Sequence, residues 1–267
     1  MRKIINKQLE QYKNNNVALL FSGGMDSLSL LLSCLDVGIK PKLYTFRLEG
    51  YMSDDSIRSK HIAEIFNLDI TEIIIEENLE NLLHDISYII EKFDVKKKTQ
   101  IQCIQPFIHI VNHVKEDVVV SGICADDIYG TSKKMQIAGR KDPYIFNEKR
   151  RLAHENIQSS SYSFIKQIFE EYNKIFVAPY KDNNCLCEYI LGKTFNQLHS
   201  PKQKNIMYES YKVELDKYKL YRRNSNLQVN SKIREYHNLL LLTDLNTRNY
   251  KSVVGIYNSM YKQIKER

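Results

Sequence analysis

Residues 17–32 read VALLFSGGMDSLSLLL, and this stretch decides the fold. The apolar run Val17–Phe21 predicts a short buried strand, and the leucine-rich run Leu28–Leu32 predicts an apolar helix. The hexapeptide SGGMDS between them predicts a tight turn. Such a strand–turn–helix unit binds anions, because backbone N–H groups and the positive end of the helix point at the bound group. We therefore expect a phosphate site at residues 22–27.

The side chains of this turn suit a phosphate that is bound together with a metal ion. Gly23 and Gly24 allow a tight turn and a close approach of the backbone to a phosphate. Ser22 and Ser27 add hydroxyl donors. Asp26 would repel a bare phosphate, so its presence predicts a Mg²⁺ ion between them. The turn matches neither the dinucleotide fingerprint nor the Walker loop. The alternative is a capped helix that follows a glycine turn and has no ligand.

The composition indicates a globular protein. The chain has 267 residues, of which 43% are hydrophobic, so it suits one large domain or one domain with a helical extension. No apolar run approaches the roughly 20 residues that span a bilayer, and the first residues lack the apolar core of a signal peptide. Five scattered cysteines suit a reducing compartment. We therefore expect a cytoplasmic protein that has no membrane partner.

The net charge of +7 leaves two interpretations open. A positive surface attracts nucleic acid or another polyanion, including ATP, but a lysine-rich composition also produces solvated basic faces. The runs Lys96–Lys98 and Lys133–Lys134 are short and have no interleaved aromatic residues. They favour a small anionic ligand over nucleic acid.

Predicted strands and helices alternate after the opening unit. Apolar runs and helical periodicity place strands at residues 41–46, 70–75 and 118–120, and helices at residues 55–66, 79–93 and 105–114. This order predicts an α/β fold with a doubly wound, mostly parallel sheet, in which ligands bind at the carboxyl ends of the strands. From residue 147 onward the chain is mostly helical. We expect a nucleotide-binding core at residues 1–145, and a helical region at residues 146–267 that packs on it and completes the active site.

A second polar motif follows the strand predicted at residues 118–120. Residues 118–134 read VVVSGICADDIYGTSKK, so Gly122 and the adjacent acids Asp126 and Asp127 come directly after a buried run. If Asp126 converges with Asp26 at the edge of the sheet, the two carboxylates can share one Mg²⁺ ion on the phosphates of ATP. The alternative is an acidic pair that caps the following helix.

Both motifs resemble those of a known superfamily. The SGGMDS turn is similar to the S-G-G-x-D-S loop of the ATP pyrophosphatases, which split ATP into AMP and pyrophosphate and activate a substrate as an adenylate. Residues 121–130, SGICADDIYG, resemble the S-G-x-G-x-D-E-x-x-x-G element of the synthetase domain of asparagine synthetase. In this resemblance Asp127 replaces a glutamate, and Cys124 replaces a glycine.

The resemblance implies ATP and Mg²⁺ as cofactors and assigns residues to them. Pyrophosphate would be held by the loop residues Ser22, Gly23, Gly24 and Ser27, and Mg²⁺ by Asp26 and Asp126. Gly122 would let the nucleotide approach the backbone. Leu20 and Phe46, with Phe21 and Thr45, would border the adenine.

Three basic residues are the catalytic candidates that the resemblance implies. Residues 200–210 resemble the family's K-x-x-L-R-x-A helix and place Lys204 on its lysine. Residues 221–228 resemble its R-x-K-x-x-F loop, with Arg222 on the arginine and Asn224 where a lysine is expected. Arg223 or Lys219 could replace that lysine. These cations would neutralise pyrophosphate as the Pα–Pβ bond breaks, although the arginine pair also suits a solvated turn.

The acceptor side of the site departs from the family. Ile175 stands where the related β-lactam synthetases carry a glutamate, and Gly130 is followed by Thr131 and Ser132 instead of the family's Gly-Gly-Tyr ending. Arg2 stands where glutamine-dependent relatives begin with a cysteine nucleophile, so we expect no glutaminase domain. These departures leave the acceptor and the nucleophile undetermined.

The resemblance implies a carbon–nitrogen ligase that forms AMP and pyrophosphate. A small substrate's carboxylate would become an acyl-adenylate, and ammonia or an amine would then displace AMP. One alternative is a tRNA- or nucleobase-modifying enzyme of the same superfamily. Another is a nucleotide-binding module without catalysis.

Overall fold

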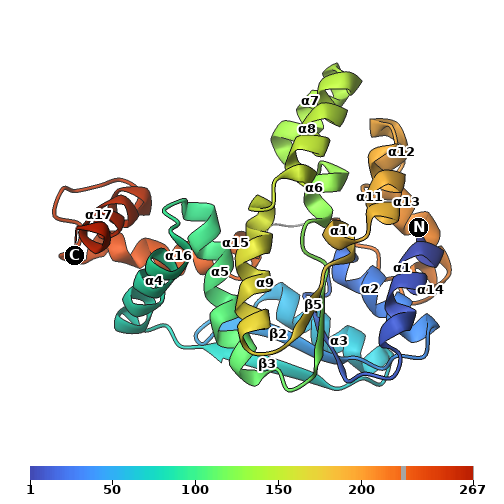
Figure 1. Ribbon diagram of the computed structural model, residues 1–267, viewed down its shortest axis with the longest axis horizontal. Helices are drawn as coiled ribbons and strands as arrows, with labels where there is room; N and C mark the ends of the chain where they lie inside the picture. Colours follow the sequence, from blue (N-terminus) through green and yellow to red (C-terminus); the bar gives the residue numbers. More distant parts are fainter. Residues whose placement is uncertain (224–226, 267) are drawn as a thin grey trace.

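The computed structural model describes residues 1–223 and 227–266 and confirms the doubly wound α/β fold. Five parallel strands form one sheet in the order β3-β2-β1-β4-β5 (Figure 1). The chain starts in the middle of the sheet, builds two strands to one side and then crosses to the other side. The switch point therefore lies between β1 and β4, where ligands of such sheets bind. The strands are β1 (Val17–Leu20), β2 (Lys42–Leu48), β3 (Ile70–Ile75), β4 (Val118–Ser121) and β5 (Ile175–Val177).

Alternation of side chains along the central strands separates two apolar layers. Leu19 of β1 and its register partner Val120 of β4 pack into one layer, whereas Ala18 and its partner Val119 pack into the other. The first layer includes α1 (Arg2–Leu9), α2 (Met25–Asp36), α3 (Asp54–Ile65) and α11 (Asn184–Leu191). The second includes α4 (Leu79–Phe93), α5 (Lys98–Ile110), α9 (Tyr162–Glu171), α16 (Ile233–Asn238) and α17 (Val253–Lys265).

Short helices follow the carboxyl ends of β4 and β5. Helices α7 and α8 project together from the body of the molecule, and α17 lies at the C-terminal end beside α4 (Figure 1). None of the described helices combines the length and the apolar content needed to cross a membrane. The remaining elements are α6 (Ala125–Tyr129), α7 (Lys133–Lys141), α8 (Pro143–Glu155), α10 (Pro179–Asp182), α12 (Phe195–His199), α13 (Asn205–Ser210), α14 (Lys212–Lys217), α15 (Leu227–Asn230), and the 3-10 turns η1 (Glu10–Tyr12), η2 (Val111–His113), η3 (Ser159–Ser161) and η4 (Leu239–Leu242).

The elements with local end signals have the bounds that the sequence predicts. The α4 helix begins after Asn78, whose side chain accepts hydrogen bonds from two backbone N–H groups of the first turn, and it ends at Asp94 in the left-handed conformation. By contrast, the helix predicted at residues 105–114 starts seven residues earlier, at Lys98. Pro106 lies in the interior of this helix and does not end it. The last helix, predicted from residue 246, starts at Val253.

The fifth strand, β5, was not predicted from the sequence. The three residues of β5 form a parallel ladder with β4, whereas the sequence predicts mostly helix from residue 147. The sheet therefore takes its edge strand from the C-terminal side of the predicted boundary. The division into a core at residues 1–145 and a packed region at residues 146–267 stays a prediction.

Candidate functional site

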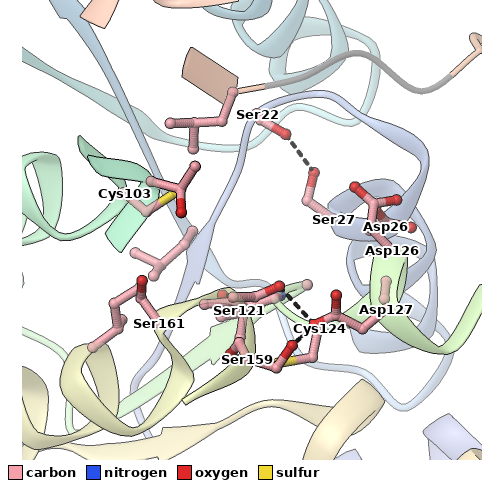
Figure 2. A pocket seen from close by; sticks show the side chains of 18 of the residues that line it. Ser22, Asp26, Ser27, Cys103, Ser121, Cys124, Asp126, Asp127, Ser159 and Ser161 are labelled. Carbon is pink, nitrogen blue, oxygen red and sulfur yellow. Dashed lines mark hydrogen bonds between the residues drawn. The ribbon is translucent and has the colours of Figure 1, made fainter. Parts of the chain in front are cut away.

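A cavity of about 870 Å³ opens at the carboxyl ends of β1, β2 and β4. Its size lies in the upper part of the range for small-molecule sites. Figure 2 shows side chains from both sequence motifs facing it. Gly23 and Gly24 are not among the residues that line it. The predicted ligand-binding residues that do line the cavity are Leu20, Phe21, Ser22, Asp26, Ser27, Thr45, Phe46, Gly122 and Asp126.

The loop at residues 22–27 has the geometry of an anion-binding turn. Gly24 is the N-cap of the twelve-residue helix α2, and no side chain caps that helix end, so its first N–H groups point outward. Gly23 has φ +68°, and a Cβ there would lie 3.0 Å from Arg58 Cγ. Ser22 Oγ lies 3.4 Å from Ser27 Oγ (Figure 2). Glycine and serine thus have conformational and hydrogen-bonding reasons to stand here.

Arg58 fixes this loop, although nothing in the sequence singled it out. Its Nε donates to the carbonyl oxygen of Gly23 at 2.7 Å, and its guanidinium also donates to the carbonyl of Leu220. Burial, and then the neighbouring Arg222, lower the pKa of Arg58. The side chain therefore joins the glycine turn to the segment that precedes the predicted arginines.

Lys204 lies between the two predicted metal ligands. Its Nζ is 2.5 Å from Asp26 Oδ1, 2.6 Å from Asp26 Oδ2 and 2.7 Å from Asp126 Oδ1. The lysine side chain is only 1% exposed. Asp26 and Asp126, from the ends of β1 and β4, thus converge as the metal hypothesis requires (Figure 2). The convergence of Lys204 on the same point was not predicted.

Burial and charge act in opposite directions on these three groups. Burial raises the pKa of Asp26 to about 6, even though Lys204 lowers it, and Asp126 raises it further. Burial opposes the charge on Lys204, but the two carboxylates outweigh that effect and raise the pKa of the lysine. The ammonium therefore stays charged at neutral pH and compensates part of the negative charge of the acids.

The surroundings of Lys204 hold it in place. The residue is the N-cap of α13 and has a left-handed backbone, with φ +56°. Its Nζ lies 5.6 Å from the centre of the Tyr129 ring, and the backbone oxygen of Tyr129 accepts a hydrogen bond from His199 Nε2 at 2.7 Å. A buried aromatic face beside an ammonium adds cation–π attraction.

The donor set fits a Mg²⁺ ion that arrives with phosphate. Among residues 1–223 and 227–266, no group of three or more His, Cys, Asp or Glu side chains could hold a metal. Magnesium typically binds through one or two carboxylates together with substrate phosphates and water. Asp26 and Asp126 supply two carboxylates beside an anion-binding loop, which matches that pattern.

Gly122 allows the two motifs to meet. A Cβ on this residue would lie 3.0 Å from Asp26 Cβ and 3.1 Å from the backbone nitrogen of Ser27. Any larger residue would push the end of β4 away from the start of α2. The predicted approach of the nucleotide to Gly122 stays a prediction.

The adjacent acids Asp126 and Asp127 have different partners. Asp126 Oδ1 accepts from Thr131 Oγ1 at 2.8 Å and faces Lys204. Asp127 Oδ2 accepts from Ser159 Oγ at 2.8 Å (Figure 2). It also accepts from Ser160 Oγ at 2.7 Å. Burial raises the pKa of Asp127. The serines of η3, which the sequence did not indicate, thus form a polar wall with Asp127.

Neither of the two predicted catalytic arginines is among the residues that line the cavity. Arg222 Nη1 is 3.4 Å from Asp55 Oδ1, and Asp55 itself lines the cavity. Arg223 is exposed and forms no ion pair with the described residues. Asn224, the position of the expected lysine, lies outside the described residues. The catalytic roles of Arg222 and Arg223 stay predictions.

Comparisons with known proteins place the chain in a family. The chain matches the family described as asparagine synthase over residues 2–247. It is 31% identical over 132 residues to MJ0830 of Methanocaldococcus jannaschii, an uncharacterized protein; the match covers 48% of this chain and 46% of that protein. The chain thus spans less than half of that relative.

A structural comparison also finds a solved structure from the same organism. It is described as a predicted subunit of tRNA methyltransferase, is 15% identical, and gives a TM-score of 0.38 over 66% of this chain and 75% of that chain. The match over residues 2–247 covers most of the sequence, including both motifs and Lys204. The chain belongs to the asparagine synthase family.

Proposed function

We propose that this protein is an ATP-dependent synthetase that activates a carboxylate as an acyl-adenylate and then forms an amide. The convergence of Asp26, Asp126 and Lys204 beside the loop at residues 22–27 carries the proposal. Membership of a family that uses ATP supports it. The acceptor is a small carboxylate-bearing molecule, and ammonia or an amine is the nucleophile.

The loop and the three charged residues act on the phosphates. Backbone N–H groups at residues 22–27 and the hydroxyls of Ser22 and Ser27 bind the β- and γ-phosphates. Asp26 and Asp126 would hold Mg²⁺, which would supply charge neutralisation on the leaving pyrophosphate. The Lys204 ammonium stabilises the same developing charge, because preorganised cations act strongly in a partly dehydrated site.

The bonds change in two steps. A carboxylate oxygen of the acceptor attacks Pα, the bond from Pα to the bridging oxygen breaks, and pyrophosphate leaves with the electron pair. The nitrogen nucleophile then attacks the acyl carbon, AMP leaves, and the nitrogen loses a proton. Leu20, Phe46, Asp127, Ser159 and Ser160 all line the cavity. In this proposal Leu20 and Phe46 would border the adenine, and the polar wall of Asp127, Ser159 and Ser160 would face the acceptor.

Pyrophosphate release tests this proposal. A screen of carboxylic acids with ATP, Mg²⁺ and ammonium should find an acceptor that triggers release. Asp26→Asn should lower that rate by about 100-fold or more, in the range seen when one electrostatic group is removed. Asp69→Asn, at an exposed aspartate, is the matched control and should retain the rate. ATP binding without release for any acceptor would support a binding module and reject the synthetase.

A second candidate function is ATP-dependent modification of an RNA base, and helix α7 favours it. Its four cations, Lys133, Lys134, Arg140 and Lys141, recur at a spacing that puts them on one helix face, and all four are exposed. They form no ion pairs with the described residues. Lys133 also lines the cavity, so this basic face leads to the cavity mouth. Unpaired RNA bases can leave the strand and enter such a pocket.

RNA binding at several salt concentrations tests the second candidate. If α7 contacts phosphates, changing Lys133 and Lys134 together to Gln should weaken binding of a single-stranded RNA and reduce the salt slope by about 1–2. The matched control changes Lys262 and Lys265 of α17 to Gln. Equal RNA affinity for the two variants would reject α7 as an RNA-binding face.

A further inference from the structure

Lys204 Nζ lies between Asp26 and Asp126, the two residues that would hold a metal. We propose that, without nucleotide, the Lys204 ammonium substitutes for the metal between these two carboxylates, so that Mg²⁺ binds only together with ATP. This inference rests on the proposed function for the identity of the nucleotide. It concerns the order of binding and not the acceptor.

The first argument is that the carboxylate oxygens are already engaged. Lys204 Nζ contacts both oxygens of Asp26 and one oxygen of Asp126, and the last also accepts from Thr131 Oγ1. At least three of the four carboxylate oxygens are thus engaged. A free Mg²⁺ ion would have to displace the ammonium from these oxygens before it could bind.

The second argument is the balance of charge. One ammonium and two carboxylates leave a local charge of −1. Adding a divalent ion alone would place it against a buried ammonium, where repulsion is stronger than in water. The polyanionic triphosphate of ATP supplies enough negative charge for both cations. The site is therefore complementary to the metal–nucleotide complex and not to the metal alone.

The third argument is the small number of protein ligands. Magnesium requires about six oxygen ligands in near-octahedral geometry and gives up its waters reluctantly. Within the described residues, only Asp26 and Asp126 converge on this point, and no third acidic or histidine ligand joins them. Phosphate oxygens would complete the ligand set.

The lysine has the properties that such a substitution requires. Its backbone is fixed at the start of α13, but its four-carbon stem lets the ammonium move between acceptors while the backbone stays in place. When ATP binds, the ammonium can exchange part of its contact with Asp26 for phosphate oxygens. Lys204 is therefore both a resident cation and a positioning residue that keeps the two acids together.

Binding of Mn²⁺, monitored by electron paramagnetic resonance, tests this proposal without any turnover. In the wild type, Mn²⁺ alone should bind weakly, and α,β-methylene-ATP should increase its affinity at least tenfold. In Lys204→Met, Mn²⁺ alone should bind at least tenfold more tightly than in the wild type. Adding Asp126→Asn to that variant should abolish the gain. Lys212→Met, at an exposed lysine, should behave like the wild type.

The outcomes separate this inference from the proposed function. Tight Mn²⁺ binding by the wild type without nucleotide would overturn the inference, even if Lys204→Met failed to fold. Equal Mn²⁺ affinity in the wild type and a folded Lys204→Met would also overturn it. Failure to find an acceptor that releases pyrophosphate would reject the synthetase but leave the Mn²⁺ measurements unchanged.

Discussion

The Nε atom of Arg58 donates a hydrogen bond to the carbonyl oxygen of Gly23 at 2.7 Å, and so joins helix α3 to the phosphate-binding turn. The same guanidinium contacts the carbonyl of Leu220. One side chain therefore holds two segments that are far apart in the sequence in a fixed relation at the edge of the site.

Replacing Arg58 by Met should weaken ATP binding by about tenfold, because the loop loses its fixed position and one charge-assisted hydrogen bond of roughly 1.5–3 kcal/mol. Arg58→Lys should not restore affinity, since an ammonium cannot reproduce the two directions of the guanidinium. Calorimetric titration with ATP measures the affinity of both variants. Lys60→Met, two residues further along α3, is the control. Unchanged affinity in Arg58→Met would contradict the role of this contact.

Gly23→Ala should also impair the loop. A residue with a side chain at φ +68° costs about 1–2 kcal/mol, and its Cβ would meet Arg58 Cγ at 3.0 Å and the backbone nitrogen of Ser59 at 3.2 Å. We expect a lower melting temperature and weaker ATP binding. Gly50→Ala is a matched control, because its Cβ would meet only the flexible end of Glu77, at 3.4 Å. Similar losses in both variants would contradict this explanation.

Arg150 should be a determinant of stability. It is fully buried and donates to the backbone oxygens of Ile128 and Ile190, both at 2.6 Å, so it joins α8 to α6 and α11. Arg150→Met leaves these oxygens unsatisfied and should lower the free energy of unfolding by about 2–5 kcal/mol. Its neighbour Arg151 is half exposed. Arg151→Met should therefore change the free energy of unfolding by less than about 0.5 kcal/mol. Urea denaturation of the two variants and the wild type measures both changes in the free energy of unfolding.

Acid should destabilise the protein through His237. The imidazole is fully buried. Its Nδ1 forms a hydrogen bond with the Tyr257 hydroxyl, and its Nε2 has no hydrogen-bond partner within residues 1–223 and 227–266. Burial lowers its pKa to about 3. Below about pH 6.5 the unfolded chain therefore binds a proton at His237, whereas the folded protein does not. The free energy of unfolding consequently falls as the pH falls from 6.5 towards 3.

This linkage amounts to about 2 kcal/mol between pH 7 and pH 5. His237→Gln removes the titrating group, so its free energy of unfolding should fall less over this interval than that of the wild type. His61→Gln, at an exposed histidine, should keep the wild-type dependence. Identical pH dependence in the wild type and His237→Gln would contradict the assignment.

The central fold was predictable because its signals are local. The strand at residues 70–75 and the helix at residues 79–93 have the predicted bounds, since β-branched runs and an asparagine cap act over a few residues. The strand β5 was missed because its three residues gain order from the ladder with β4, which is a long-range contact. The interior Pro106 likewise concealed the first turns of α5.

The site was predictable where one motif contains its residues. The loop at residues 22–27 and Asp126 line one cavity, as the carboxyl-end rule for parallel strands predicts. The partners from other elements were not predictable by this rule. Arg58 and Ser159 have no distinctive spacing in the sequence. Ile175 starts β5 opposite Val118, at the amino end of the strand. Its position relative to the cavity is therefore set by the register of β5 against β4, which the sequence motif does not reveal.

The ion pair between Lys204 and Asp26 joins residues that are 178 positions apart. A ribosome adds about 5–20 residues per second, so the lysine is made roughly 10–35 s after the aspartate. Between the synthesis of Asp126 and that of Lys204, the nascent chain contains the phosphate loop and both acids but not the cation between them. We therefore expect ATP cleavage to begin only after the C-terminal helices have been synthesised and docked, which protects the growing chain from futile use of nucleotide.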